Sequence, residues 1–307
     1  MSRWSRWRFA AKPPSWPKIL VPALLGQALG VAAVARLDPV ALGIGVALAV
    51  CDVLFIVFLN DWADRDVDRI KREMFPRSSK KTIPDGVLSA RALLAAGALA
   101  GLGALAVATV GSLALDRPWL IPITIVGLLV FATYSLPPLR LNYRGGGELL
   151  ETIGVGLLTP IAHAYLQSGE LVPRVGSGSL MGLAALSLAS AVASGLSDER
   201  SDREGGKRTV VTMLGNRIAR ALIESLTYAG AALWLLAPIF DSTTPGLAGG
   251  GAGALVLVHA LAMRRLSRAA ETDAFDAQRA YKAELHRGIW RGALWLAMLL
   301  AWRSLWP

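Results

Sequence analysis

The sequence predicts an all-α membrane protein, a bundle of nine transmembrane helices that forms one domain over residues 1–307. Hydrophobic residues make up 54% of the chain and charged residues only 18%, whereas about a quarter of the residues in soluble domains are charged. The apolar residues run in blocks of roughly 18–24, which is long enough to cross about 30 Å of hydrocarbon. Basic residues gather in alternate loops between these blocks.

The expected spans follow one another along the chain. They cover about 17–35, 39–60, 89–113, 119–135, 147–167, 178–197, 214–236, 244–262 and 285–304. The block 119–135 is the shortest and contains Pro122, which neighbouring helices can accommodate within a membrane. Residues 1–16 are basic and aromatic and are expected to lie at the membrane interface.

The distribution of positive charge predicts the topology. Of the 32 Lys and Arg residues, 28 fall before the first block or after an even-numbered block, and the exceptions are Arg36, Arg117, Arg174 and Arg303. The positive-inside rule therefore places the N-terminus in the cytoplasm, in a membrane of the bacterial inner-membrane type. The net charge of +10 is explained by this asymmetry, so it does not indicate nucleic-acid binding.

A dense acidic cluster ends the second expected span. Taken as a continuation of that helix at about 100° per residue, Asn60, Asp61, Asp64 and Asp68 share one face of roughly a quarter turn. Carboxylates near a membrane span are costly and mark function. Because several carboxylates on one face repel each other unless a cation lies between them, the cluster predicts a site for Mg²⁺, a hard ion bound by oxygen ligands.

A second acidic cluster ends the sixth expected span, at the same side of the membrane. Asp198 and Asp202 are four residues apart and share a helical face. Paired glycines at 205–206 predict the end of that helix, after which Lys207 and Arg208 are expected to fold back towards the carboxylates. Two acidic faces with flanking cations are typical of a metal-bridged diphosphate site. The segments 61–88 and 198–213 are the expected cytoplasmic motif loops, and the active site is expected on the cytoplasmic side.

These motifs resemble those of the UbiA superfamily of intramembrane prenyltransferases. The first cluster matches its NDxxDxxxD motif, and the second matches its DxxxD motif. Three further stretches are similar to family segments, and they begin at Lys12, Tyr134 and Gly206. The resemblance covers most of residues 12–217 and implies the nine-helix fold.

The resemblance also implies a reaction. Mg²⁺ ions held by both motifs would bind the diphosphate of a polyprenyl donor, and loss of diphosphate would leave an allylic cation for an aromatic acceptor to attack. The implied catalytic residues are Asp61, Asp64, Asp68, Asp198 and Asp202, which with Asn60 form the implied metal ligands. The implied substrate-binding residues are Asn60, Lys207, Arg208, Arg72, Arg77, Tyr134, Arg140 and Ser194. The expected partners are thus a prenyl diphosphate, an aromatic small molecule and membrane lipid.

The acceptor stays open at this point. The stretches 143–148 and 206–209 are more similar to the dihydroxynaphthoate (menaquinone) branch, whereas Arg65 and Asp66 within the first motif favour the hydroxybenzoate and chlorophyll branches. Ser194 stands where the dihydroxynaphthoate branch usually has Asn. Two alternatives remain. A terpene cyclase would use the same motifs without an aromatic acceptor, and a transporter would use inverted repeats with broken helices.

Overall fold

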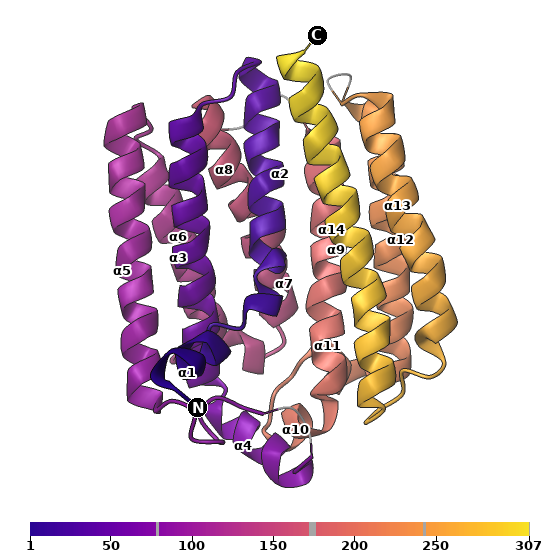
Figure 1. Cartoon of the computed structure of the whole chain (residues 1–307). Helices are drawn as coiled ribbons and strands as arrows, with labels where there is room; N and C mark the ends of the chain where they lie inside the picture. The colour runs from indigo at the N-terminus through magenta and orange to yellow at the C-terminus, as the bar shows by residue number, and fades with distance from the viewer. Residues whose placement is uncertain (78–79, 172–175, 242–243, 307) are drawn as a thin grey trace.

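The chain folds into a bundle of long helices that run side by side, with short helices gathered at one end (Figure 1). The computed structural model describes residues 1–77, 80–171, 176–241 and 244–306, and all regular structure within these ranges is helical. Ser78 and Ser79 of the loop 61–88, and Arg174, lie outside the described residues.

The long helices carry the apolar blocks of the sequence. They are α2 (Pro17–Val34), α3 (Pro39–Ala63), α5 (Ala90–Leu115), α6 (Leu120–Ser135), α9 (Ser177–Ser194), α12 (Asn216–Phe240), α13 (Gly246–Ser267) and α14 (Phe275–Leu305). A further span, Gly147–Ser168, is composed of α7 (Gly147–Glu151), a π-helical stretch (Thr152–Leu158) and α8 (Thr159–Ser168). The other short helices are α1 (Arg3–Ala10), α4 (Arg65–Met74), α10 (Glu199–Glu204) and α11 (Val210–Leu214), with 3₁₀ turns at Pro13–Ser15, Leu141–Tyr143 and Gly195–Ser197.

Local sequence signals set several of the helix ends. The Asp38 carboxylate accepts hydrogen bonds from the backbone N–H groups of Val40 and Ala41 and so caps α3. Ser89 caps α5 in the same way. Pro17 opens α2, where its missing N–H costs nothing. Gly169 ends α8 with a φ of 79°, a backbone conformation that glycine adopts without strain.

The bundle confirms an all-α membrane protein but not the count of nine spans. Seven helices in the described part of the chain are long and apolar enough to cross a membrane. Helix α6 is apolar but shorter, with 16 residues. Helix α14 is 31 residues long, yet Arg291 and Arg303 lower its hydropathy. The prediction that α6 and α14 also span, and that the N-terminus is cytoplasmic, stays a prediction.

The helices pack as two groups. Helices α2, α3, α5, α6 and α8 contact one another, as do α9, α12, α13 and α14, and α2 joins the groups by packing against both α8 and α14. The core of the second group surrounds the fully buried side chains of Trp234 and Tyr281. Gly182 permits α9 to approach α12 there, because a Cβ at this position would lie 2.2 Å from Cδ1 of Trp234.

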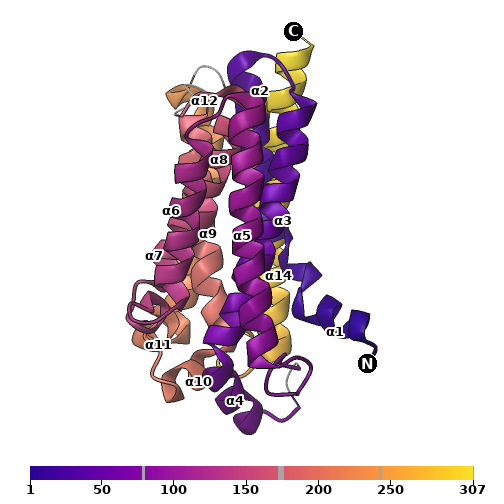
Figure 2. The ribbon, with the colours of Figure 1, turned by 90° about the vertical axis from the view of Figure 1, so that its left-hand side faces the viewer.

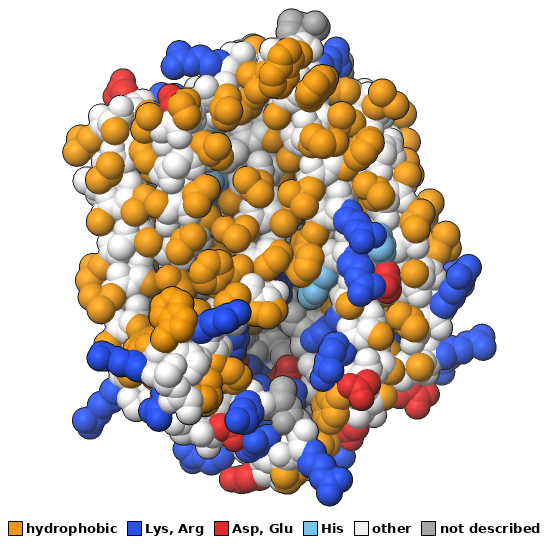
Figure 3. All heavy atoms as spheres, in the orientation of Figure 1, with side chains coloured by type: hydrophobic (Ala, Val, Ile, Leu, Met, Phe, Trp, Pro, Cys, Tyr) orange, Lys and Arg blue, Asp and Glu red, His pale blue; other side chains and the backbone are white. Residues whose placement is uncertain are grey.

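The surface and the two ends differ in chemistry. Apolar side chains cover most of the face in Figure 3. On the surface of the whole bundle, large apolar side chains such as Leu99, Leu113 and Leu247 are 69–81% exposed, as expected for contact with lipid. Charged side chains gather at the lower end of that view. This is the end that carries α1, α4 and α10, and Figure 2 shows the same grouping after a quarter turn.

Candidate active site

The first acidic motif lies at a bend between α3 and α4. Asn60 and Asp61 occupy the last turn of α3, Asp64 caps it, and Asp68 lies in the first turn of α4. The expectation of one continuous helix is therefore wrong, since α3 ends at Ala63. Helix α4 is mostly charged, and by turning at Asp64 it lies across the end of the bundle and does not prolong α3 (Figure 1).

The second motif lies beside the first. Asp198 caps α10, Asp202 lies in its first turn, and Gly205 ends it. Helix α10 packs on α4. A Cβ at Gly205 would lie only 2.5 Å from Cγ2 of Val67, so the glycine permits the close contact between the two motif segments.

Both motifs face one polar cavity of about 250 Å³. All five aspartates of the two motifs line it, together with Asn60, Lys12, Lys81, Lys207, Tyr134, Asn142, Glu148, Glu151 and Ser194. The structure thus brings together the two clusters that the sequence places 130 residues apart, counted from Asp68 to Asp198.

Each motif aspartate is paired with a lysine. Lys12 pairs with Asp61, and Lys71 pairs with Asp198 while also donating to the carbonyl oxygen of Ser197 at 2.7 Å. The remaining pairs join Nζ of Lys81 to Oδ1 of Asp68 at 2.6 Å, Nζ of Lys207 to Oδ2 of Asp64 at 2.8 Å, and Nζ of Lys207 to Oδ1 of Asp202 at 3.9 Å. The lysines thereby offset the repulsion among carboxylates that share a small cavity.

These pairs shift the pKa of several groups at the end of the bundle. Burial acts to lower the pKa of Lys207, whereas the charges of the neighbouring Asp64 and Asp202 raise it. The net result is a pKa above the ordinary lysine value. Burial opposes ionisation of Asp198 as well, but Lys71 and Lys81 hold its pKa below the usual range. Burial raises the pKa of Asp202, and the nearby charge of Asp198 adds to the rise. The pKa shifts therefore favour the charged form of Lys207, while Asp198 and Asp202 differ in their readiness to ionise.

The donor set fits Mg²⁺, although it is not preassembled. Within the described residues, no three His, Cys, Asp or Glu side chains already form a cluster close enough to hold a metal ion, and lysines pair with the motif carboxylates. The donors are nevertheless the oxygens that Mg²⁺ prefers, and they line a single cavity. The predicted ligands Asn60, Asp61, Asp64, Asp68, Asp198 and Asp202 are the residues that would hold the ion.

The other predicted substrate-binding residues divide into three sets. Tyr134 and Ser194 line the cavity, and Oγ of Ser194 accepts a hydrogen bond from Lys18 at 3.2 Å. Arg140 donates to the carbonyl oxygen of Ala63 at 2.6 Å and lies 3.7 Å from the Tyr143 ring centroid, so it supports the end of α3. Three arginines are not among the residues that line the cavity: Arg72 pairs with Asp85 at 2.9 Å, and Arg77 and Arg208 are exposed.

Sequence reasoning missed several residues in and beside the cavity. Lys71 does not line the cavity but pairs with Asp198, and its position in the sequence gave no signal for a partner in the second motif. Oε1 of Glu148 accepts a hydrogen bond from the backbone N–H of Val210 at 2.7 Å and so holds the segment after the second motif. Asn142 is only 4% exposed, and neither atom of its amide has a hydrogen-bond partner in the described structure. A buried amide without partners is costly, so Asn142 is a candidate for contact with a ligand in the cavity that it lines.

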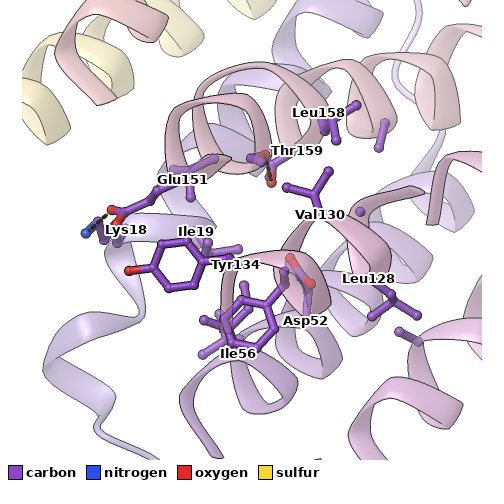
Figure 4. A pocket seen from close by; sticks show the side chains of 18 of the residues that line it. Lys18, Ile19, Asp52, Ile56, Leu128, Val130, Tyr134, Glu151, Leu158 and Thr159 are labelled. Atoms are coloured by element: carbon purple, nitrogen blue, oxygen red, sulfur yellow. Dashed lines mark hydrogen bonds and ion pairs between the residues drawn. The ribbon is translucent and has the colours of Figure 1, made fainter. Parts of the chain in front are cut away.

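An apolar chamber of about 350 Å³ adjoins the polar cavity. Lys12, Asn60, Tyr134, Glu151 and Ser194 line both, so the two meet at these side chains. Beyond them the walls are mainly aliphatic and aromatic and come chiefly from α2, α3, α6, the π-helical stretch and α8 (Figure 4). Short π-helical segments occur often at functional sites. The arrangement can hold an anionic head in the polar cavity and an apolar tail in the chamber.

Comparison with known proteins agrees with this geometry. Residues 19–282 match the model of the UbiA prenyltransferase family. The chain belongs to this family. It is therefore a prenyltransferase-family enzyme and a multi-pass integral membrane protein, and the transporter alternative is removed.

Named relatives and solved structures give the degree of similarity. The 1,4-dihydroxy-2-naphthoate octaprenyltransferase of Mycobacterium tuberculosis is 29% identical over 236 residues, which cover 74% of this chain and 75% of that protein. The chloroplastic chlorophyll synthase of Oryza sativa subsp. japonica is 28% identical over 220 residues, 68% of this chain and 55% of that one. A UbiA homologue from Archaeoglobus fulgidus bound to DMAPP and Mg²⁺ superposes with a TM-score of 0.69 at 15% identity, covering 94% of this chain and 99% of that chain. The UbiA fold is thus confirmed.

Proposed function

We propose that the protein transfers a polyprenyl group from a prenyl diphosphate to an aromatic acceptor, with Mg²⁺, in a membrane of the bacterial inner-membrane type. One observation carries the proposal. A cavity lined by five aspartates and their lysines opens directly onto an apolar chamber. A molecule with a diphosphate head and an isoprenoid tail matches both parts, and the A. fulgidus homologue was solved with such ligands, DMAPP and GPP, together with Mg²⁺.

The polar cavity would bind the diphosphate. The oxygens of Asn60 and of the five motif aspartates would hold Mg²⁺, which when bound offsets the negative charge that develops on the leaving diphosphate. As their carboxylates turn to the metal, Lys12, Lys81 and Lys207 become free to donate to phosphate oxygens. The Asn142 amide, which is buried at the edge of the same cavity, would donate to a phosphate oxygen as well.

The apolar chamber would hold the tail and the reacting carbon. As the bond between C1 of the prenyl group and the diphosphate oxygen breaks, a ring carbon of the acceptor forms a bond to C1. That ring carbon then loses the group it carried, which is a proton at an unsubstituted position. The walls near Ile56, Leu128 and Phe131 exclude water, which would otherwise capture the allylic cation.

The expected acceptor class is a hydroxylated aromatic acid of lipid-quinone biosynthesis. Two kinds of relative support an aromatic or cyclic acceptor, a dihydroxynaphthoate octaprenyltransferase and a chlorophyll synthase. We expect 1,4-dihydroxy-2-naphthoate to be accepted ahead of 4-hydroxybenzoate, because the stretches 143–148 and 206–209 are more similar to the naphthoate branch.

The test uses purified protein with Mg²⁺, geranylgeranyl diphosphate and each acceptor in turn, and mass spectrometry identifies the lipid product. The expected product is a prenylated acceptor, formed only when both substrates are present. Asp64→Ala and Asp198→Ala should abolish it, while Arg208→Ala, an exposed residue, should retain it. A hydrocarbon formed without any acceptor would overturn the proposal in favour of a terpene cyclase.

A further inference from the structure

One carboxylate of the apolar chamber, that of Asp52, takes no part in lining the diphosphate site, whereas the chamber's other carboxylate, Glu151, lines the polar cavity as well. Asp52 lies on α3 two helical turns before Asn60, which corresponds to about 12 Å along the helix. Asp52, Ile56 and Asn60 are spaced four residues apart, and all three line the chamber. Asp52 therefore faces the same space as the prenyl tail and the reacting ring, but at a greater depth from the motifs.

Asp52 has no partner within the described structure. None of the described residues forms a hydrogen bond or ion pair with its carboxylate, and no dashed line reaches it in Figure 4. The lysines that line the chamber are already engaged, Lys12 with Asp61 and Lys18 with Glu151. An unpaired carboxylate in an apolar, membrane-embedded wall is expensive and marks function.

The other polar side chains deep in the chamber differ from Asp52 because each has a local partner. Oγ1 of Thr124 donates to the carbonyl oxygen of Leu120 at 2.8 Å, and Oγ1 of Thr159 donates to that of Gly154 at 2.9 Å. Nδ1 of His163 lies 3.3 Å from Nε2 of Gln27. Asp52 alone among these groups is left to interact with a ligand.

The chemistry of the reactants identifies that ligand. A carboxylate binds a hydrogen-bond donor. The isoprenoid tail has no donor, and the diphosphate is an anion that a carboxylate repels. Only the acceptor remains, and a ring electron-rich enough to attack an allylic cation commonly owes this to a hydroxyl group, which is also a donor.

We infer that Asp52 binds a ring hydroxyl of the aromatic acceptor and selects for acceptors in which that hydroxyl is free. The inference rests on the proposed function, because it takes the chamber to be the place where the acceptor meets the prenyl group. It assigns to Asp52 a binding role within the chamber, separate from the ionisation of the donor at the Asp motifs.

The experiment compares matched ligands at equilibrium. Binding of 1,4-dihydroxy-2-naphthoate and of 1,4-dimethoxy-2-naphthoate is measured by calorimetry on purified protein with Mg²⁺ and a slowly reacting thiodiphosphate analogue of the donor. The pair 4-hydroxybenzoate and 4-methoxybenzoate is measured alongside. We expect the wild type to favour the hydroxyl form of at least one pair by roughly 10-fold to 100-fold, the range for a hydrogen bond to a charged group.

Three variants separate a binding role from a structural one. Asp52→Leu should remove the preference for the hydroxyl form, and Asp52→Asn, which keeps the size and one acceptor oxygen, should retain a smaller preference. Thr124→Val changes another polar side chain of the same wall and should leave the preference intact. The ratio between two ligands is insensitive to a general loss of folded protein.

Distinct outcomes overturn distinct claims. If the wild type shows no preference in either pair, or if Asp52→Leu changes only the affinity for the donor analogue or the chain length that it accepts, the assignment of Asp52 is wrong. Product formation is measured on the same preparations. If the wild type shows the preference but forms no prenylated product, the assignment of Asp52 stands and the proposed function is wrong. If the wild type forms the product and Asp52→Leu keeps the preference, the proposed function stands and the assignment of Asp52 is wrong.

Discussion

Nζ of Lys207 lies 2.8 Å from Oδ2 of Asp64, so a residue that follows the second motif neutralises a carboxylate of the first across 143 positions of sequence. The backbone N–H of Lys207 also donates to the carbonyl oxygen of Asp202 at 2.7 Å, which ties the lysine to α10. Lys207 therefore joins the two motifs physically before any metal or diphosphate is bound.

Loss of Lys207 should change the affinity for Mg²⁺ and the affinity for diphosphate in opposite directions. In Lys207→Met, Mg²⁺ no longer competes with an ammonium group for Asp64, so the affinity for Mg²⁺ alone should rise. Diphosphate binding in the presence of Mg²⁺ should weaken by roughly 10-fold or more, because a charged hydrogen bond is lost. Calorimetric titration with MgCl₂ and then with inorganic diphosphate measures both. Arg208→Met is the matched control, and as an exposed residue it should alter either affinity by about twofold at most. A parallel fall in both affinities for Lys207→Met would contradict this account.

Asn142 should show opposite effects on stability and on substrate binding. Its buried amide has no hydrogen-bond partner among the residues that the structure describes, and replacing such a group by an apolar one of similar size is nearly neutral or stabilising. Asn142→Leu should therefore keep or raise the melting temperature in detergent, while KM for the prenyl diphosphate rises. Thermal unfolding and steady-state kinetics measure the two effects. A lower melting temperature together with an unchanged KM would show that the amide has a structural role.

The sequence predicted the two motifs and their common end of the bundle because those features depend on local spacing. The spacing of Asn60, Asp61, Asp64 and Asp68 locates them near a helix end, and the apolar blocks place that end at a membrane surface. The lysine partners were not predictable in the same way. The positive-inside rule explains why the loops are basic, but it does not say which lysine pairs with which carboxylate. Only the tertiary structure brings particular lysines to particular carboxylates, and these lysines are Lys12, Lys71, Lys81 and Lys207.

Other differences have equally physical causes. The bend at Asp64 arises because α4 is too polar to continue through the membrane. This polarity depends on the composition of the residues around the motif, which the helical spacing of the motif residues does not reveal. Asp52 was available as a signal, because it is a lone carboxylate within the apolar run 39–60. It stood apart from the dense clusters, and its lack of a partner is visible only in the folded chain.

Mg²⁺ and diphosphate should stabilise the protein together more than either does alone. Lysines already neutralise the five aspartates, so Mg²⁺ alone has to displace an ammonium group from each carboxylate that it binds. Diphosphate provides the displaced lysines with a new anion. We expect MgCl₂ plus inorganic diphosphate to raise the melting temperature clearly, MgCl₂ alone to have a smaller effect, and EDTA to reverse both. Differential scanning fluorimetry in detergent provides the measurement. The double variant Asp64→Asn with Asp198→Asn should lose the extra stabilisation that MgCl₂ and diphosphate give together. If the two ligands instead raised the melting temperature by independent, additive amounts, the proposed transfer of the lysines from carboxylate to diphosphate would be contradicted.

Two glycines in the bundle should respond to the same substitution with opposite signs. A Cβ at Gly26 of α2 would lie 2.3 Å from the carbonyl oxygen of Pro160, a backbone atom of the neighbouring α8 that cannot move aside cheaply. Gly26→Ala should therefore force α2 and α8 apart and destabilise the bundle by about 1–3 kcal/mol. Gly43 of α3 is exposed, and a Cβ added at this position would meet no atom within 4 Å among the described residues. Gly43→Ala should therefore stabilise the fold by up to about 1 kcal/mol through its higher helix propensity. Unfolding in detergent, followed by circular dichroism, compares the two. Equal effects of the two substitutions on stability would contradict the close packing of α2 on α8. Because α2 contributes Lys18 and Ile19 to the chamber wall, Gly26→Ala should also weaken binding of the prenyl donor, whereas Gly43→Ala should leave that binding unchanged.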